Sequence, residues 1–413
     1  MTASPVRVLY CESNVDGTVG GSHYCLLHLV GGLDRARYEP MVAFYQHHSL
    51  VERFRAVAET LVLPGDEPIQ WGRDSQSPLA AVPAVVARRS VNLLKLFRKI
   101  AACVALIRRH GIGVVHLNNS ITRHHEWMWA ARLAGVPCVV SERGLPRYGG
   151  SDRTWSRRVA AMIPVSMAVA DGMLAQGIAA DRIRVIYDGL DPGRLVPGRT
   201  PPQVREEFGL SPDQPLVGIV GNIREWKGQE TVVRALRRVV DRHPDLVCLF
   251  VGGISPSDED YHTRLRRLVA DGGLERHVRF TGFQRDIPGL VHAFRFLIHA
   301  SIAPEPFGMV VLEAMALRRA VIGARAGGVP EMIVEGATGT TVPPADPEAL
   351  AAAMIALLDD PARTAAMGER GHQRVLDDFQ LASTVNDIQR VYDDVLAGRP
   401  PSSGRRVGNA ATR

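Results

Sequence analysis

The sequence predicts an α/β protein with two doubly wound domains, and three observations lead to this prediction. Short apolar segments alternate with longer amphipathic segments along most of the chain. Such alternation is typical of parallel sheets whose helices connect successive strands. Residues 191–202, rich in proline and glycine, interrupt the pattern, which restarts at residue 216. The length of 413 residues suits two domains, each with its own core.

The first domain is expected to cover residues 1–195. Its apolar segments are short enough for buried strands and lie at residues 6–10, 40–44, 61–63, 114–117, 138–141, 162–165 and 184–187. Helical periodicity begins near residue 22 and recurs at residues 85–109, 127–133 and 168–175. Residues 64–83 are rich in Pro, Gly, Asp and Ser, which predicts a mobile loop.

The second domain is expected to cover residues 196–380. Strands are predicted at residues 216–220, 247–251, 278–281, 296–298 and 320–324. Helices are predicted at residues 230–241, 262–271, 287–292, 307–317 and 347–359. A last helix, within residues 381–397, is expected to cross back to the first domain. Residues 398–413 are predicted to be a disordered tail.

Composition excludes several classes of protein. The chain is 46% hydrophobic and 22% charged, as is usual for a soluble globular protein. No apolar run approaches the ~18 residues of a membrane span, and the N-terminal residues lack a signal-peptide pattern, so we expect a cytoplasmic location. The five cysteines have no metal-type spacing. We expect no nucleic acid among the partners.

Positive charge is concentrated in the first half. Residues 1–195 carry 23 Arg and Lys against 16 Asp and Glu, whereas the rest carries 26 against 27. This imbalance suits a phosphate-bearing acceptor or peripheral contact with the inner membrane surface. One predicted helix groups several basic residues, namely Arg88, Arg89, Lys95, Arg98 and Lys99. Solvated arginine-rich faces are an equally simple interpretation, and both stay open.

Two carboxylates, Glu305 and Glu313, lie eight positions apart across a predicted junction between a strand and a helix. We expect Glu305 in the loop and Glu313 about two turns into the helix. The free N–H groups of the helix start between them favour a phosphate. A nucleotide sugar fits this pattern, because its pyrophosphate can bind the amides. Its two hydroxyl-rich ends, the hexose and the ribose, can bind the two carboxylates.

A lysine stands where a pyrophosphate needs a positive charge. Lys227 follows the first strand of the second domain and is one of only three lysines, the others being Lys95 and Lys99. Arg224 can add a bidentate contact from the same loop. A solvated loop lysine is the alternative interpretation of Lys227.

A glycine loop follows the first strand, and Gly20 and Gly21 allow a phosphate or sugar to approach the backbone closely. A dinucleotide site would also need an acidic residue after the second strand. Residues 45–48, Tyr-Gln-His-His, supply none, which counts against an NAD-dependent dehydrogenase.

Three further positions have two interpretations each. His116, at the end of a strand, either contacts a donor-sugar hydroxyl or is a buried histidine bonded to its neighbours. Glu331, after the turn at residues 327–330, either faces the ligand or favours the dipole of the helix that it starts. Asp258 and Asp260 match an Asp-x-Asp metal pattern, but capping of the following helix explains them better, so we expect no metal site.

Taken together, these motifs resemble the family 4 retaining glycosyltransferases of the GT-B fold, in which two Rossmann-like domains face a central cleft. The resemblance covers residues 5–395 approximately. It depends on the loop at Gly20 and Gly21 and on segments 165–166, 185–191, 221–228, 305–313 and 327–331. The chain departs from the family pattern at Asn222 and Asn118, where arginine and histidine are usual.

The resemblance implies a role for each candidate residue. Glu305, Lys227 and His116 would be the catalytic set, with Glu305 on the donor hexose and Lys227 on the diphosphate. Glu313 would bind the ribose, and Gly282 and Phe283 would lie near the base. The remaining donor-binding residues would be Gly20, Gly21, Arg224, Phe307, Gly308, Met309, Val310 and Glu331.

The resemblance also implies the reaction, which is transfer of a hexosyl group from a UDP- or GDP-sugar with retention and without cofactor or metal. The acceptor would be a glycan or a lipid-linked glycan of the cell envelope, bound by the first domain. Two alternatives stay open, a sugar-nucleotide epimerase and a nucleotide-sugar-binding homologue without catalysis.

Overall fold

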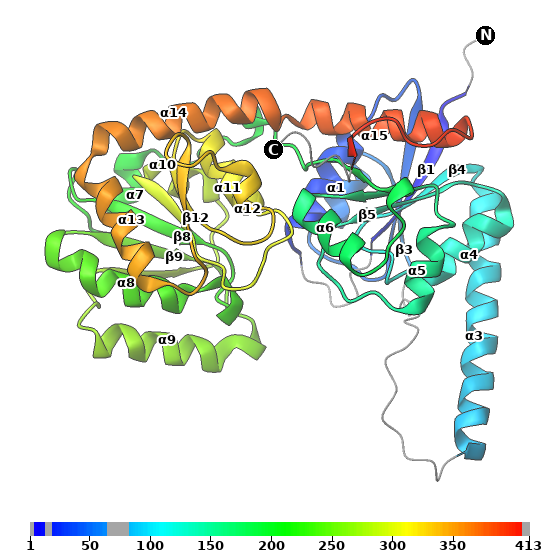
Figure 1. Ribbon diagram of the computed structural model, residues 1–413, viewed down its shortest axis with the longest axis horizontal. Helices are drawn as coiled ribbons and strands as arrows, with labels where there is room; N and C mark the ends of the chain where they lie inside the picture. Colours follow the sequence, from blue (N-terminus) through cyan, green and yellow to red (C-terminus); the bar gives the residue numbers. More distant parts are fainter. Residues whose placement is uncertain (1–3, 13–18, 64–81, 407–413) are drawn as a thin grey trace. The chain divides into compact units, whose positions relative to one another are not determined.

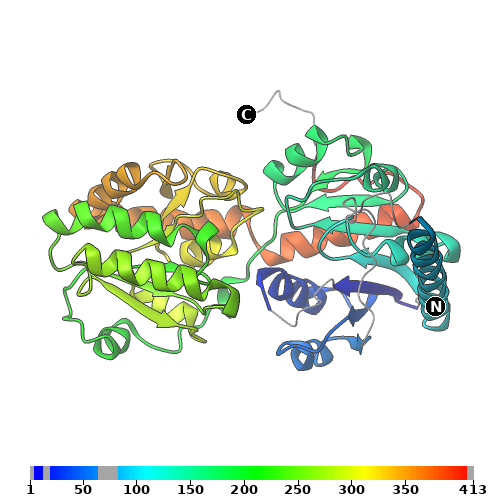
Figure 2. The ribbon, with the colours of Figure 1, turned by 90° about the horizontal axis from the view of Figure 1, so that it is seen from below.

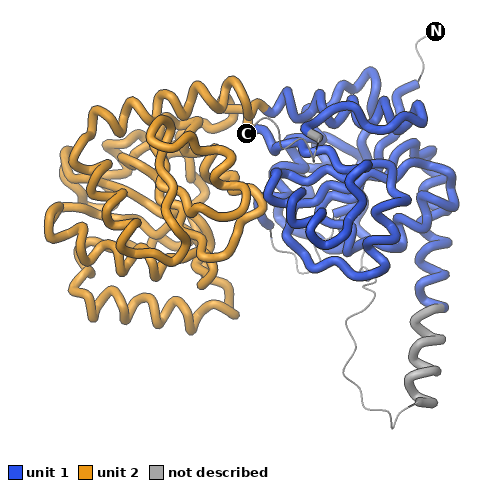
Figure 3. Tube along the Cα trace, viewed as in Figure 1, with its two compact units in different colours: residues 1–189, 381–413 blue, residues 190–380 orange. Residues whose placement is uncertain are grey.

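The computed structural model describes residues 4–12, 19–63 and 82–406. The chain forms two compact units, shown in Figure 3. Unit 1 comprises residues 1–189 and 381–413, and unit 2 comprises residues 190–380. Each unit contains a six-stranded sheet in which all neighbouring strands that pair are parallel. The predicted fold class, with two doubly wound Rossmann-like domains, is confirmed.

The sheet of unit 1 has the strand order β3-β2-β1-β4-β5-β6. Its strands are β1 (Val6–Glu12), β2 (Tyr38–Phe44), β3 (Glu59–Val62), β4 (Ile112–Leu117), β5 (Cys138–Glu142) and β6 (Ala161–Pro164). Its helices are α1 (Gly21–Gly32), α2 (Val51–Arg55), α3 (Val82–Arg109), α4 (His125–Ala134), α5 (Gly150–Ser156) and α6 (Met167–Ala175). The predicted mobile loop at residues 64–83 lies largely outside the described residues. The side chains of Arg88 and Arg89, in the predicted basic helix, also lie outside them.

Helix α15 (Leu381–Leu396) returns the chain to unit 1, where it lies beside α1 (Figure 2). The Tyr392 hydroxyl lies 2.9 Å from that of Tyr10, and the Tyr38 hydroxyl donates to Asp393 at 2.7 Å. Beyond the helix, β14 (Arg405–Arg406) pairs antiparallel with β7 (Arg184–Val185). The prediction of a disordered tail from residue 398 is therefore wrong for residues 398–406, and residues 407–413 lie outside the described residues.

Unit 2 repeats the topology of unit 1, with the strand order β10-β9-β8-β11-β12-β13. Its strands are β8 (Leu216–Val220), β9 (Val247–Val251), β10 (Val278–Gly282), β11 (Phe296–His299), β12 (Ala320–Ala324) and β13 (Gly339–Val342). Its helices, most of them labelled in Figure 1, are α7 (Pro201–Glu207), α8 (Gln229–Arg242), α9 (Glu259–Asp271), α10 (Ile287–Ala293), α11 (Met309–Ala316), α12 (Val329–Met332), α13 (Pro347–Asp359) and α14 (Pro361–Asp378).

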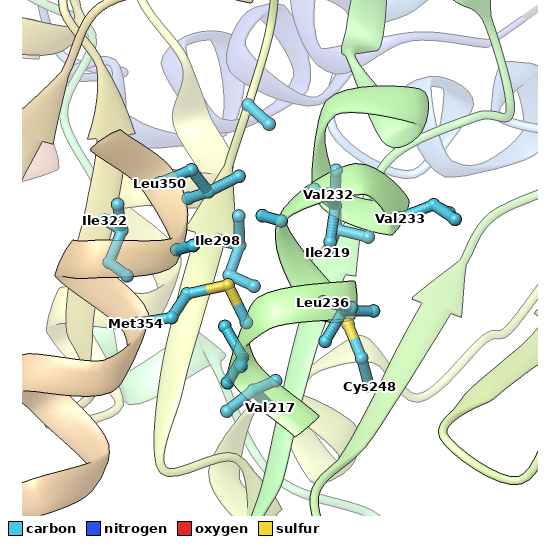
Figure 4. Close-up of a cluster of buried hydrophobic side chains, with 14 of the residues drawn as sticks. Val217, Ile219, Val232, Val233, Leu236, Cys248, Ile298, Ile322, Leu350 and Met354 are labelled. Carbon is cyan, nitrogen blue, oxygen red and sulfur yellow. The ribbon is translucent and has the colours of Figure 1, made fainter. Parts of the chain in front are cut away.

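One apolar core fixes the strands of unit 2 from one face. Alternate strand residues such as Ile298 and Ile322 pack with side chains of α8, α9 and α13. Figure 4 shows Leu350 and Met354 of α13 and Leu236 of α8 within this cluster. Each fully buried aliphatic side chain contributes about 1.5–3 kcal/mol. Because this core holds the strands in register, their carboxyl ends present the following loops at fixed positions.

In unit 2, some prolines are the first residues of helices that the sequence analysis did not predict. Pro201 lies inside the predicted linker but is the first residue of α7, and the Thr200 hydroxyl accepts from the Gln203 amide as its cap. Helix α14, which we did not predict, begins in the same way at Asp360 and Pro361. In the described ranges, no helix is both long and apolar enough to cross a membrane.

Candidate functional site

The loops at the carboxyl edge of the unit 2 sheet are tied to one another. The Ile302 amide donates to the carbonyl of Trp226 at 2.9 Å, and the Gly328 amide donates to that of Glu305 at 2.9 Å. Strands β8 and β11 are neighbours at the point where the strand order reverses. In open α/β sheets this switch point is where ligands bind.

Two glycines allow these loops to pack against each other. Gly228 has a φ of 73°, and a Cβ there would lie 1.9 Å from the carbonyl oxygen of Ala300. Gly327 has a φ of 63°, and a Cβ there would lie 2.0 Å from the carbonyl oxygen of Glu305. Any other residue would be strained and would collide with backbone, so both glycines are needed to build this edge.

The packed loops bring Lys227 and Glu305 together. The Lys227 Nζ lies 2.6 Å from the Glu305 Oε1, with side-chain exposures of 19% and 9%. The same ammonium lies 4.3 Å from the centroid of the Trp226 ring. Burial raises the pKa of Glu305, but the hydrogen bond from His299 and the charge of Lys227 outweigh it and hold the pKa far below its ordinary value. Glu305 is therefore ionised at neutral pH.

Glu313 lies in the helix that follows Glu305 and has a different environment. Helix α11 begins at Met309, so Glu313 lies about one turn into the helix and the prediction of two turns is wrong. Within the described residues its carboxylate has no hydrogen bond or ion pair. Burial raises its pKa to about 7. A half-buried acid without a partner at a helix start suits a hydroxyl-bearing ligand.

The start of α11 also presents donors for an anion. Gly308, with a φ of 105°, occupies the N-cap position, and the Phe307 side chain before it is buried. The first N–H groups of a helix, here those of Met309 and Val310, have no partner within the helix. These amides and the Lys227 ammonium belong to neighbouring loops of one sheet edge.

Arg224 belongs to the same loop as Lys227, but its side chain contacts the segment between β9 and α9. Its guanidinium forms an ion pair with Asp258 at 3.3 Å and donates to the Ser255 hydroxyl at 3.3 Å. Asp258 occupies the N-cap position of α9 but makes no capping hydrogen bond. The capping interpretation of Asp258 is therefore wrong, and this carboxylate orients Arg224 instead.

The other predicted residues of unit 2 lie at the same sheet edge. Gly282 has a φ of 67° and its carbonyl accepts from the Gly252 amide at 3.0 Å. The Phe283 ring next to it is 74% exposed, although large apolar side chains are usually buried. Glu331 lies within the short α12, whose last residues are held by Arg374 through backbone carbonyls.

The environment of His116 does not fit the interpretation in which this residue contacts a sugar. The ring is fully buried in unit 1, with Nδ1 2.5 Å from the Tyr392 hydroxyl and Nε2 2.8 Å from the Ser141 hydroxyl. Burial lowers its pKa to about 3. Both ring nitrogens are occupied inside the unit, so this geometry does not support the predicted catalytic role, and the buried, satisfied histidine is the better description.

Gly20 and Gly21 lie at the start of α1 in unit 1. Gly20 has a φ of −126°, and its amide donates to the Nδ1 of His23 at 3.2 Å. A Cβ at either glycine would meet nothing within 4 Å in the described part of the chain. Neither backbone strain nor packing against the described residues therefore requires glycine at these two positions, and their role in ligand binding stays a prediction.

Two family models together cover most of the chain. The Glycosyltransferase Family 4 model matches residues 19–194, and the Glycosyl transferases group 1 model matches residues 202–374. The chain belongs to the family 4 glycosyltransferases.

Curated relatives of this glycosyltransferase cover part of its length. A D-inositol 3-phosphate glycosyltransferase of Corynebacterium glutamicum is 32% identical over 52% of this chain and 53% of its own. A GDP-mannose-dependent alpha-(1-6)-phosphatidylinositol monomannoside mannosyltransferase of Mycolicibacterium smegmatis is 35% identical over 46% of this chain and 51% of its own. The chain thus spans about half the length of these relatives.

Solved structures share its fold along nearly the whole chain. HepE of Anabaena in complex with UDP has a TM-score of 0.78 at 22% identity, covering 94% of this chain and 100% of its own. A glycosyltransferase of Rickettsia africae has a TM-score of 0.78 at 20% identity, covering 95% and 99%.

The site of this family 4 glycosyltransferase includes two side chains that the sequence did not single out, His299 and Ser301. Both contact the Glu305 carboxylate, His299 through Nε2 at 3.0 Å and Ser301 through its hydroxyl. A signal was present, because both are polar residues directly at the end of a buried strand, where a parallel sheet presents its site.

Replacing Glu313 by Gln is expected to stabilise the protein at high pH and not at low pH. Because its pKa of about 7 lies above the ordinary 4.5, the folded state favours the protonated acid. The free energy of unfolding therefore falls as pH rises from about 4.5 to about 7, and Glu313→Gln avoids this loss. We expect a gain of about 1–3 kcal/mol at pH 8 and little at pH 4.5, measured by urea unfolding.

Glu335→Gln is the control of opposite sign. Burial raises the pKa of Glu335, but hydrogen bonds from Thr340 and Thr341 outweigh it and lower the pKa. This substitution is expected to destabilise the protein at pH 8. An equal effect of Glu313→Gln at both pH values would contradict the desolvated state of Glu313.

Proposed function

We propose that the chain is a retaining glycosyltransferase that moves a hexosyl group from a nucleoside diphosphate sugar to an acceptor hydroxyl. The observation that carries the proposal is the Lys227–Glu305 pair at the switch point of the unit 2 sheet. It places an ammonium for phosphate charge directly beside a carboxylate for sugar hydroxyls. The free carboxylate of Glu313 lies one turn into the helix that follows.

The donor is bound part by part. Lys227, Arg224 and the amides of Met309 and Val310 hold the diphosphate. Glu313 accepts hydrogen bonds from the ribose, which suits its lack of a partner, and Glu305 accepts from the hexose. Phe283 and the backbone at Gly282 contact the base, and Glu331 adds a polar contact. In unit 1, Gly20 and Gly21 leave the backbone accessible to a phosphate or sugar.

The chemical step breaks the bond between the anomeric carbon and the phosphate oxygen and forms one to the acceptor oxygen on the same face. The departing phosphate takes the proton of the acceptor hydroxyl. Lys227, Arg224 and the helix-start amides stabilise the charge that develops on this phosphate, so the step needs no metal ion or cofactor. Preorganised donors of this kind contribute several kcal/mol each to a transition state, about 3–4 for one oxyanion-hole donor.

Two similar proteins support the proposed substrates. HepE is bound to UDP in its structure, and the mannosyltransferase of Mycolicibacterium smegmatis is GDP-mannose-dependent by name, so the donor is a UDP- or GDP-sugar. We place the acceptor, a glycan or lipid-linked glycan of the cell envelope, against unit 1.

We further propose that the protein is cytoplasmic and contacts the inner membrane surface through α3. There Leu94 and Phe97 are 61% and 59% exposed beside Lys95 and Arg98. Apolar and basic side chains together suit an anionic bilayer. Co-sedimentation with phosphatidylglycerol vesicles tests this contact, and equal recovery with neutral vesicles would contradict it.

A nucleotide panel tests the function. We expect UDP or GDP, but not ADP, to raise the melting temperature, and the matching sugar conjugate to be consumed when acceptor extract is added. Consumption at the same rate without acceptor would favour an epimerase or hydrolase. Binding with no turnover under either condition would favour a non-catalytic homologue, and absence of binding would refute the proposal.

A further inference from the structure

The carboxylate of Glu305 is held entirely by one of its oxygens. Oε1 lies 2.6 Å from the Lys227 Nζ and 3.0 Å from the His299 Nε2, and it also accepts from the Ser301 hydroxyl. Among the described residues no hydrogen bond reaches Oε2. This oxygen is also not fully buried, because it is absent from the buried side-chain atoms that lack a partner. Since the side chain keeps 9% of its exposure, Oε2 is the oxygen that remains for a ligand.

His299 is fixed in the wall behind this carboxylate. It is the last residue of β11, and its side chain is 4% exposed. Its Nδ1 is buried and has no hydrogen-bond partner in the described structure, so its polar contacts are those of Nε2. Because an ionised carboxylate only accepts, the Nε2 must be the protonated nitrogen that donates to Glu305.

Ser301 adds a second donor from the same side. It is 1% exposed, and its hydroxyl also lies 3.4 Å from the Nε2 of His299. His299 and Ser301 therefore form a buried bracket on Oε1 that belongs to the rigid end of β11. Lys227 contacts the same oxygen from the neighbouring loop, which follows β8.

Donor binding changes the balance of charge around Oε1. In the proposed function Lys227 must serve the diphosphate, whose negative charges draw the ammonium away from the carboxylate. A buried carboxylate that loses a neighbouring cation is destabilised. The bracket remains when Lys227 moves, because neither His299 nor Ser301 is expected to bind the donor.

We propose that His299 is a positioning residue that, with Ser301, keeps the Glu305 carboxylate ionised and oriented while Lys227 engages the diphosphate, so that Oε2 is free to accept from a hexose hydroxyl. This inference rests on the proposed function. It adds His299 and Ser301 to the site and assigns Lys227 and His299 to different parts of the donor. Lys227 is then needed for the nucleoside diphosphate as such, and His299 only for the sugar attached to it.

The test compares two replacements that differ in where they place a donor. In His299→Gln the side-chain amide lies where the Nε2 was, whereas in His299→Asn it lies near the former Nδ1 and cannot reach Oε1. His277→Asn is the matched control, since His277 is also buried in unit 2 but bonds the Leu246 carbonyl before β10 begins. Ser301→Ala removes the second donor of the bracket.

The wild type is first tested with UDP, GDP, UDP-glucose and GDP-mannose. Each variant is then measured with the nucleoside diphosphate and the sugar conjugate, of either UDP or GDP, that the wild type binds more tightly. Calorimetry gives the affinities, and release of nucleoside diphosphate from the conjugate in the presence of acceptor extract gives turnover. We expect His299→Asn to lower turnover and the affinity for the conjugate about tenfold to a hundredfold, the effect of one hydrogen bond to a charged group. Affinity for the free nucleoside diphosphate should not change, and His299→Gln should restore most of the loss.

Ser301→Ala should act in the same direction as His299→Asn, and His277→Asn should leave both affinities and turnover at the wild-type values. The inference is wrong if the wild type binds and consumes a conjugate but His299→Asn behaves like His277→Asn. It is also wrong if His299→Asn lowers the affinity for the free nucleoside diphosphate as much as the affinity for the conjugate. The same holds if His299→Gln has no more turnover or conjugate affinity than His299→Asn. A wild type that binds none of the four compounds would instead refute the proposed function, and this inference with it.

Discussion

Lys227→Ala is expected to lower turnover by a factor of about 100–1000 or more and to weaken binding of the free nucleoside diphosphate. The ammonium is held at the switch point by its contacts with Glu305 and the Trp226 ring. Removing it leaves Arg224 as the one cation of this loop for the departing diphosphate, and the charge of Arg224 is already partly compensated by its ion pair with Asp258. Steady-state turnover and calorimetry of UDP and GDP measure the two effects.

The fold is expected to survive Lys227→Ala, because His299 and Ser301 still hold the Glu305 carboxylate. Lys95→Ala, at an exposed position of α3, is the matched control and should leave the affinity for UDP and GDP unchanged. Near-normal turnover of Lys227→Ala with the wild-type melting temperature would refute the assignment of Lys227 to the diphosphate.

Glu305→Gln is expected to lower turnover by about a hundredfold and, unlike Lys227→Ala, to strengthen binding of the free nucleoside diphosphate. The amide keeps the shape of the side chain but cannot compensate the Lys227 ammonium, which is then free for the phosphates. The sugar loses a charged acceptor at the same time. Opposite signs for the two variants in nucleotide affinity are the distinguishing result.

The effect of Glu305→Gln should not depend on pH between 5 and 9. His299 and Lys227 hold the pKa of Glu305 far below this range, so the wild-type carboxylate is ionised throughout. Glu335→Gln removes a carboxylate whose pKa is also lowered, but by Thr340 and Thr341, and should leave turnover unchanged. A loss of activity that appears only above pH 7 would assign the effect to Glu313 instead.

Periodicity located most strands because a strand buried on both faces needs a continuous apolar run, as in β8 and β9. It missed β13, whose Gly-Thr-Thr-Val sequence is only partly buried at the edge of the sheet. It also missed α14, although Asp360 and Pro361 are typical helix-start residues. Here the information was in the sequence and was not used.

The position of each candidate residue along the chain followed from the sequence, because parallel strands present polar residues at their carboxyl ends. The positions of Lys227, Glu305 and Glu313 after their strands therefore predict that they lie at one edge of the sheet. The pairing of Lys227 with Glu305 was not predictable, since it joins residues 78 positions apart through loops packed at Gly228 and Gly327.

The order of apolar and polar segments was enough to predict a two-domain α/β protein and to group the candidate phosphate-binding residues at one edge of the second domain, because local periodicity and charge are properties of short segments. Tertiary structure alone decided which polar residues are available to a ligand. His116 and His299 both lie near the carboxyl ends of buried strands. Tyr392, 276 residues away, contacts the first, whereas the second donates to Glu305. Hydrogen bonds between distant segments assign these roles, and no local pattern encodes them.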